Sequence, residues 1–298
     1  MVGFDRTENG LVQFEGTDVH IFSITDNNID EKTVKSFGEE WTKFNHFNEE
    51  EIKKAGDQYF DIVSDKLIEG KYILDVGCGT GRWTKYLLNK AAFVECIDPS
   101  DAVYAAAKLL RGYSNVRVSQ AGAESIPFPD NSFDFVFSLG VLHHTPDTET
   151  AMRHCVKKVK GGGYFMVYLY YSLDNRGLLF KILYRTSDFF RRIICRLPSA
   201  IKKFICDLIA VFVYMPFVLI TKFFRLICLK KFSKKIPLSY YADHSFRIIK
   251  NDALDRFGTP LEQRFSKQQI KEMMQKCGLT NIVFSDNEPY WHALGQKL

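Results

Sequence analysis

The stretch ILDVGCGTGRWT, residues 73–84, places an acid directly before a glycine-rich turn. Three glycines follow Asp75 at alternate positions: Gly77, Gly79 and Gly81. Such turns usually hold phosphates through backbone N–H groups and a helix N-terminus, and the dinucleotide fingerprint is G-x-G-x-x-G rather than G-x-G-x-G. Because a carboxylate at this place repels a phosphate, we expect a ligand with a positive group and no phosphate.

A second acid, Asp98, ends the next predicted strand, 21 positions after Gly77. A carboxylate at that place in a nucleotide-binding sheet holds two ribose hydroxyls. The site therefore combines a ribose clamp, a turn that allows close backbone approach, and an acid for a cation. S-adenosylmethionine (SAM) has a ribose, an ammonium and a sulfonium but no phosphate, so the residues predict SAM as the cofactor.

The elements that must position these residues alternate between strand and helix from Lys71 onward. Short apolar runs predict strands over 71–76, 92–98, 116–121, 133–139 and 163–171. Helical spacing marks 81–90, 99–112 and 148–163, and the C-terminal part adds a helix over 266–278 and edge strands over 281–287 and 290–296. This alternation predicts an α/β fold: a Rossmann-like, seven-stranded, doubly wound sheet whose last strand is antiparallel.

Four segments follow from this pattern. We expect an N-terminal helical cap (1–70), a SAM-binding core (71–171), a helical insert after the fifth strand (172–258) and a C-terminal completion of the sheet (259–298). The cap carries four large aromatic residues, Phe37, Trp41, Phe44 and Phe47. They either cover a ligand pocket or pack a helix on the rim of the sheet.

The insert is strongly basic. Between Arg176 and Lys235 there are 14 Lys and Arg residues against two acids, a net charge of +12, so the rest of the chain carries −7 of the total of +5. Its first helix has an apolar stripe opposite a charged face. The apolar run 208–220 has 13 residues and contains Pro216, whereas a membrane span needs about 20, so we predict no span.

Two interpretations of the insert remain open. It is either a basic amphipathic element at a membrane surface, or a lid or dimer surface whose charges stay solvated. Seven scattered cysteines without a CxxC pair indicate reduced thiols in a cytoplasmic protein. The first ten residues contain no apolar run, so we expect no secretory signal, and His143, His144 and His154 do not have metal-ligand spacing.

Taken together, four motifs resemble class I SAM-dependent methyltransferases, of the group that includes the ubiquinone and menaquinone methyltransferases. They are ILDVGCGTGR, VECIDPSDA, AESIPFPDNSFDFVFSLGVLHH and KKVKGGGYFMV, which occur in order between residues 71 and 171. Weaker similarity extends to FGEEWTKF and to residues 255–279, an arrangement that resembles bacterial methyltransferases of surface-polysaccharide and secondary-metabolite pathways.

The resemblance implies roles for particular positions. Asp75 and the turn at Gly77, Cys78 and Gly79 would hold the methionine part of SAM. Asp98 would hold the ribose, and Pro99 and Ser100 would line the adenine. Gly122 stands where the family often has an acid that contacts the adenine amino group, so Ala123 and Glu124 would take over that contact. Ser138 and Leu139 would border the sulfonium.

His143 and His144 follow the fourth core strand, at the expected mouth of the pocket. One of them would act as a general base on the acceptor, or both would pack locally. Methyl transfer is an in-line displacement, so positioning supplies much of the rate even without a base. Arg82 would meet an anionic acceptor or cap the loop.

The leading hypothesis is a cytoplasmic SAM-dependent methyltransferase that acts on a small-molecule or lipid-linked acceptor. The insert would contact the inner face of the membrane as a peripheral element or form a homodimer, and no metal and no nucleic acid are expected. The first alternative is a nucleic-acid methyltransferase, because a charge of +12 can hold phosphates. The second is a non-catalytic SAM-binding protein.

Overall fold

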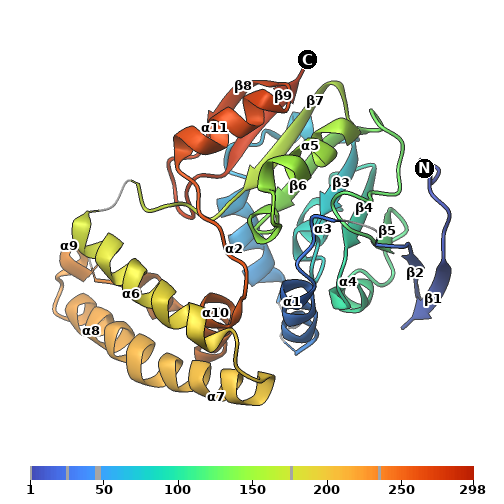
Figure 1. Ribbon diagram of the computed structural model, residues 1–298. Coiled ribbons are helices and arrows are strands. Elements are labelled where there is room, and N and C mark those ends of the chain that lie inside the picture. Colours follow the sequence, from blue (N-terminus) through green and yellow to red (C-terminus); the bar gives the residue numbers. More distant parts are fainter. Residues whose placement is uncertain (1, 25–26, 44–47, 175–176, 234–235) are drawn as a thin grey trace. The chain divides into compact units, whose positions relative to one another are not determined.

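The computed structural model describes residues 2–24, 27–43, 48–174, 177–233 and 236–298. The chain forms two compact units: unit 1 comprises Met1–Asn175 and Leu261–Leu298, and unit 2 comprises Arg176–Pro260. Unit 1 contains the sheet and the glycine turn, whereas unit 2 is helical (Figure 1). The insert predicted over 172–258 therefore falls largely within unit 2.

Unit 1 is built on one mixed sheet with the order β1-β2-β5-β4-β3-β6-β7-β9-β8. Neighbours from β2 to β7 in this order pair in parallel, and β9 pairs antiparallel with both β7 and β8. The strands are β1 (Gly10–Phe14), β2 (Thr17–Ile21), β3 (Tyr72–Val76), β4 (Phe93–Asp98), β5 (Val116–Gln120), β6 (Phe133–Leu139), β7 (Val159–Tyr168), β8 (Leu279–Phe284) and β9 (Ala293–Lys297).

The sheet has nine strands within the described residues, so the prediction of seven was wrong. The two additional strands form a hairpin in the N-terminal segment, which was predicted to be a helical cap. Glu15 and Gly16 link them with positive φ angles of 47° and 86°, the conformation of a tight two-residue hairpin turn. β2 then pairs with β5, a long-range contact that local periodicity does not reveal.

Helices cover both faces of the sheet, as the doubly wound prediction requires. Those of unit 1 are α1 (Glu31–Lys43), α2 (Glu49–Tyr59), α3 (Arg82–Leu87), α4 (Ala102–Leu109), α5 (Thr148–Lys158) and α11 (Lys267–Lys276), with short turns η1 (Asp65–Leu67) and η2 (Leu142–His144). Residues of α5 and α11 share one core cluster with one sheet face, while α3 and α4 share a second cluster with the other. The predicted cap Ser266 starts α11 with a reciprocal capping box to Gln269.

Unit 2 is a bundle of helices around a small core of its own. Its helices are α6 (Leu178–Ile194), α7 (Ser199–Ile209), the π-helical turn η3 (Ala210–Tyr214), α8 (Met215–Leu226), α9 (Lys230–Ser233), η4 (Ser239–Asp243) and α10 (Phe246–Gly258). The buried centre of the bundle contains Tyr214, Val218, Ile249 and Ala253.

The apolar run 208–220 is part of a longer helix than its 13 residues indicated, while the prediction that it does not span a membrane stays a prediction. Pro216 does not interrupt the apolar run: α7, η3 and α8 form a continuous helix of 28 residues, Ser199–Leu226, long and apolar enough to cross a membrane by length and composition. The widened π turn just before Pro216 accommodates a residue that cannot donate a helix hydrogen bond. The core helices of soluble proteins can have the same length and composition, so these two properties do not distinguish a membrane span.

Candidate functional site

The glycine turn connects β3 to α3 and has the sharp geometry that its sequence predicts. Gly77, Gly79 and Gly81 have φ angles of 79°, 53° and 77°, in the left-handed region where side chains are strained. A Cβ atom at Gly77 would lie 2.4 Å from the nearest side-chain atom of Val141. The N–H groups of Gly77 and Cys78 donate to the Ile97 carbonyl, at 2.8 and 2.9 Å, which anchors the turn to β4.

Asp75 lies on β3 and is 1% exposed. Its Oδ2 accepts a hydrogen bond from the Thr84 hydroxyl at 2.7 Å, while its Oδ1 is buried and has no hydrogen-bond partner among the described residues. Burial raises the pKa of Asp75 to about 7. A buried carboxylate oxygen without a donor is costly, so this atom is suited to a donor supplied by a ligand.

Asp98 ends β4 and is tied directly to the turn. Its Oδ2 accepts from the Gly79 N–H at 3.0 Å, and its Oδ1 accepts from the N–H and hydroxyl of Ser100, at 2.8 and 2.6 Å. Burial raises the pKa of Asp98. The structure thus brings the two acids predicted from the sequence to the same edge of the sheet, where the carboxyl ends of β3 and β4 meet.

The remaining predicted cofactor residues lie on three neighbouring segments. Pro99 and the buried Ser100 follow β4, and the Ser100 hydroxyl is engaged with Asp98. Ala123 and Glu124 are half-buried in the turn after β5, which the Ala121 N–H joins to the Asp98 carbonyl at 3.1 Å.

Ser138 and Leu139 end β6, and both are buried. The Ser138 hydroxyl donates to the Val76 carbonyl at 2.8 Å, so it links β6 to β3. Because this bond uses the hydroxyl proton, the serine side chain could contact a cofactor only as an acceptor.

The N-terminal helix α1 reaches the glycine turn. The Trp41 ring lies 3.9 Å from the Cβ position of Gly79, and the Arg82 guanidinium lies over the rings of Trp41 and Trp83, at 5.4 and 4.4 Å. The ring centroids of Phe37 and His144 are 4.8 Å apart. The other two aromatic residues singled out in the sequence, at positions 44 and 47, lie outside the described residues.

The two predicted histidines lie in η2 and are both buried. His143 is fully enclosed, with ring centroids 4.0 Å from His144 and from Tyr170, and its ring nitrogens have no hydrogen-bond partner among the described residues. Burial, together with His144 and Arg264, holds the pKa of His143 well below its usual value. The Nδ1 atom of His144 lies 2.6 Å from the Leu261 carbonyl, and since a carbonyl only accepts, Nδ1 carries the proton and Nε2 carries a lone pair.

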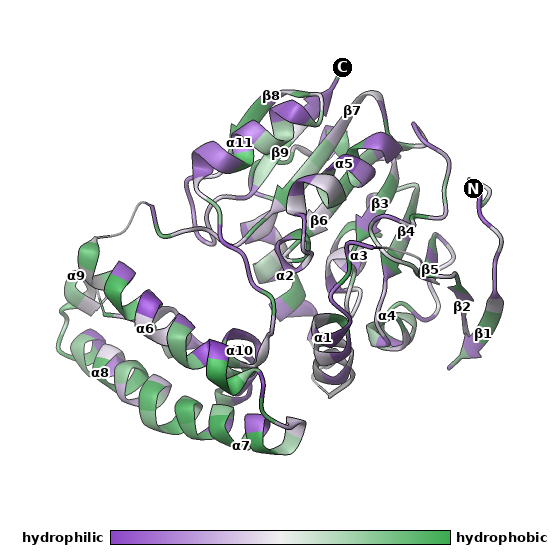
Figure 2. Cartoon of the chain, viewed as in Figure 1, coloured by the Kyte–Doolittle hydropathy of each residue, from purple (hydrophilic) through white to green (hydrophobic). Residues whose placement is uncertain are grey.

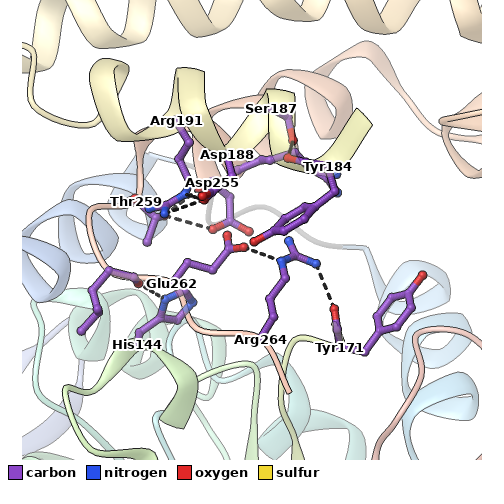
Figure 3. A network of polar contacts seen from close by, with 12 residues as sticks. His144, Tyr171, Tyr184, Ser187, Asp188, Arg191, Asp255, Thr259, Glu262 and Arg264 are labelled. Atoms are coloured by element: carbon purple, nitrogen blue, oxygen red, sulfur yellow. Dashed lines mark hydrogen bonds and ion pairs between the residues drawn. The ribbon is translucent and has the colours of Figure 1, made fainter. Parts of the chain in front are cut away.

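Close to His144 lies a polar network that the sequence did not indicate (Figure 3). Glu262 and Arg264 form an ion pair at 2.7 Å, with Glu262 only 2% exposed, and Arg264 also donates to the Tyr171 carbonyl at 3.3 Å. The Arg264 guanidinium lies 5.2 Å from the Tyr170 ring. These residues follow unit 2 in the chain, so no local motif connects them to η2.

Aromatic rings form a row along the same edge of the sheet. The centroid of Tyr59 lies 4.6 Å from that of Trp83 and 5.2 Å from that of Tyr168, and Tyr168 lies 6.0 Å from Tyr170. The row starts on α3, directly after the glycine turn, and ends beside His143.

A polar cluster around His292 was also not predicted from the sequence. His292 precedes β9 and is fully buried, and its Nε2 lies 2.7 Å from Asp61, which also accepts from Ser285 at 2.7 Å and Asn287 at 2.9 Å. Burial works against ionisation, but these hydrogen bonds together lower the pKa of Asp61. In the part of the chain that the structure describes, no three His, Cys, Asp or Glu side chains converge as a metal site would require.

Comparisons with known proteins match the part of the chain that contains the glycine turn and both acids. Residues 74–167 match the family described as "Methyltransferase domain". Among curated relatives, ubiquinone biosynthesis O-methyltransferases from Pseudomonas fluorescens (Pf-5) and Pseudomonas putida (F1) are 33% and 36% identical, over 46% and 37% of this chain and 60% and 47% of theirs. The chain therefore spans about half the length of the curated relatives it matches.

Solved structures are more distant. They include the YcgJ protein of Bacillus subtilis (17% identity, 74% of this chain and 67% of that one, TM-score 0.44). Another is an S-adenosylmethionine-dependent methyltransferase from Mesorhizobium loti (22% identity, 39% and 54%, TM-score 0.34). At these scores, the structural likenesses carry no inference about activity.

Proposed function

We propose, from the match of residues 74–167 to the family of methyltransferase domains, that the chain transfers a methyl group from SAM to a small-molecule or lipid-linked acceptor. The observation that carries the proposal is the pair of buried acids at the glycine turn. Asp75 has an oxygen that lacks a donor, and Asp98 is fixed to the N–H of Gly79. This arrangement favours a ligand that brings its own positively charged donor.

The residues fit such a cofactor. The Asp75 carboxylate would accept from the ammonium group, and the lone pair that Asp98 retains on Oδ2 beyond its three protein donors would accept a ribose hydroxyl. SAM, when bound, supplies an electrophilic methyl group on its sulfonium. In an in-line transfer the S–CH3 bond would break as the bond to the acceptor nucleophile forms, the thioether S-adenosylhomocysteine would leave, and a base of this chain or water would take the proton of the acceptor.

His144 is the better candidate for that base. The Leu261 carbonyl fixes its tautomer, so the lone pair is on Nε2, as in histidines that accept a proton from a substrate. His143 is enclosed by His144 and Tyr170, and we assign it a packing role. The aromatic row from Trp83 to Tyr170 would form a wall for a flat or apolar acceptor.

The first test identifies the class of acceptor. The chain is incubated with methyl-labelled SAM and an extract of its own host, and the label is sorted into small-molecule, lipid and RNA fractions. We expect label in the small-molecule or lipid fraction. Label confined to RNA would favour the nucleic-acid alternative, and SAM binding by calorimetry without any transfer would favour the non-catalytic one.

Histidine variants then test the base on the labelled fraction. We expect His144→Ala to lower the rate about 100-fold with SAM affinity unchanged, and added imidazole to restore part of that rate. His143→Gln is the matched control, because we expect it to lower stability with a smaller effect on rate. Equal losses in both variants without imidazole rescue would contradict the role of His144.

The finer assignments rest on unit 2. We propose that the acceptor is lipid-linked and that the protein is cytoplasmic and meets its acceptor at the inner face of the membrane, where anionic lipids attract basic segments. Unit 2 carries 17 Lys and Arg residues against five Asp, so its net charge of +12 supports this location.

A further inference from the structure

We propose that unit 2 docks on an anionic membrane surface through the outer face of the helix Ser199–Leu226, which lies in the plane of the membrane and does not cross it. The inference rests on the proposed function only for the purpose of docking, which is to reach a lipid-linked acceptor. Docking itself depends on the surface of unit 2 and can be measured separately from methyl transfer.

The outer face of this helix is apolar without interruption. Between Lys203 and Lys222, every exposed residue is apolar: Phe204, Leu208, Val211, Phe212, Val213, Pro216, Leu219 and Ile220. Phe204 and Phe212 are 63% and 72% exposed, and beyond Lys222 the face continues with Phe223 and Leu226. Figure 2 shows α7 and α8 as the predominantly hydrophobic part of unit 2. Soluble proteins rarely expose an apolar surface of this extent, which marks an interaction site.

Basic residues accompany this face. Lys203 and Lys222 are the exposed charges that bound it, α6 adds exposed Lys181 and Arg185 among exposed Leu183, Phe189 and Phe190, and exposed Arg196 follows α6. The acids of these two helices are engaged within unit 2. Asp188 pairs with Arg191 and Arg192, at 2.7 and 2.8 Å (Figure 3), and Asp207 pairs with Lys250 at 2.9 Å. An apolar face with unneutralised cations complements a bilayer of anionic lipid.

The inner face of the same helix argues against a span. Tyr214 donates to Asp252 of α10 at 2.7 Å, and Asp207 pairs with Lys250 of the same helix. Near the C-terminal end of the long helix, Arg225 pairs with Asp243 at 2.6 Å. A transmembrane orientation would carry α10, with Lys250, Asp252 and Asp255, into the hydrocarbon, at a cost of several kcal/mol. Lying in the plane buries the outer face and keeps α10 in water.

Vesicle co-sedimentation of the full chain tests the docking. We expect binding to vesicles of phosphatidylcholine mixed with phosphatidylglycerol, with more than about tenfold weaker binding to phosphatidylcholine alone and a steep decrease with added salt. The triple variant Phe204→Ser, Phe212→Ser, Phe223→Ser leaves the charge unchanged and should bind at least about tenfold more weakly. The double variant Lys203→Gln, Lys222→Gln should bind anionic vesicles more weakly, by up to about fivefold per residue.

The matched control replaces exposed apolar residues of unit 1. Leu11→Ser, Val12→Ser, Val283→Ser changes the same number of exposed side chains and should leave vesicle binding unchanged. Calorimetry with SAM should give the same affinity for all variants, because the glycine turn lies in unit 1. A wild-type chain that binds vesicles but does not bind SAM would therefore refute the proposed function and not the docking.

Four results would overturn the docking proposal. The first is a wild-type chain that ignores anionic vesicles. The second is a stable dimer by light scattering that the triple Phe→Ser variant dissociates, which would mean that a second copy covers the face. The third is resistance of the membrane-bound chain to alkaline carbonate extraction, which would mean that Ser199–Leu226 spans the bilayer. Salt-sensitive binding to RNA without vesicle binding is the signature of the nucleic-acid alternative and would also refute it.

Discussion

Unit 1 keeps its large apolar side chains inside, whereas unit 2 turns many of them outward. Of the 26 large apolar residues that are exposed among the described residues, 21 lie in unit 2, which comprises 85 of the 298 residues. In unit 1, two apolar clusters fill the two faces of the sheet, and the buried acids sit at its carboxyl edge. The difference is what the docking proposal explains: unit 1 would be surrounded by water, whereas the exposed apolar face of unit 2 would lie against a membrane surface.

The largest effect is expected from a matched pair of substitutions that compares a buried ring of unit 1 with an exposed ring of unit 2. Phe137→Ala in unit 1 removes a fully buried ring and should lower the free energy of unfolding by about 3–5 kcal/mol. Phe212→Ala in unit 2 removes a ring that is 72% exposed and should change it by less than about 0.5 kcal/mol. Chemical denaturation without lipid measures both. A large loss for Phe212→Ala would mean that this face is already covered within the protein.

A smaller effect tests the geometry of the cofactor turn. Gly77→Ala adds a Cβ in a left-handed conformation, 2.4 Å from Val141, and should destabilise the chain by about 2–5 kcal/mol and abolish measurable SAM binding. Gly16→Ala is the control, since its φ of 86° is equally unfavourable but its Cβ meets nothing within 4 Å. We expect a loss of about 1–2 kcal/mol there, with SAM binding intact. If Gly77→Ala binds SAM normally, the turn is not the cofactor site.

The smallest effect for a single step of the measurement, one pH unit, is the pH dependence that Asp75 confers. Burial raises the pKa of its carboxyl from 3.8 to about 7, so the folded chain binds this proton more tightly than the unfolded chain does. Stability without SAM should therefore fall as pH rises from 3.8 to 7, by up to about 1.4 kcal/mol per pH unit. Asp75→Asn should lack that part of the slope, as thermal unfolding across pH would show.

SAM affinity should change in the opposite direction. As pH rises through about 7, Asp75 ionises and can pair with the ammonium group, so wild-type affinity should increase. Asp75→Asn should bind about tenfold more weakly at high pH and show little of this increase. An affinity that is flat with pH in the wild type would remove Asp75 from ammonium binding.

Local patterns in the sequence determined the cofactor edge of unit 1. Because consecutive parallel strands end at one edge, the acid before the glycines and the acid after the next strand had to meet there, and Asp98 does contact the Gly79 N–H. Short periodic runs likewise specified the core strands and the capped helix α11. Such features depend on residues close together in the chain.

Only the tertiary structure decided which distant segments meet. Pairing of β2 with β5, the hydrogen bond from Arg264 to the Tyr171 carbonyl, and the contact of His292 with Asp61 join residues far apart in sequence, and no periodicity encodes them. The tertiary structure also decided which face of each helix in unit 2 is covered. Hydrophobic spacing identifies an apolar side but not what packs on it, and here α10 covers one side of Ser199–Leu226 while the other stays exposed.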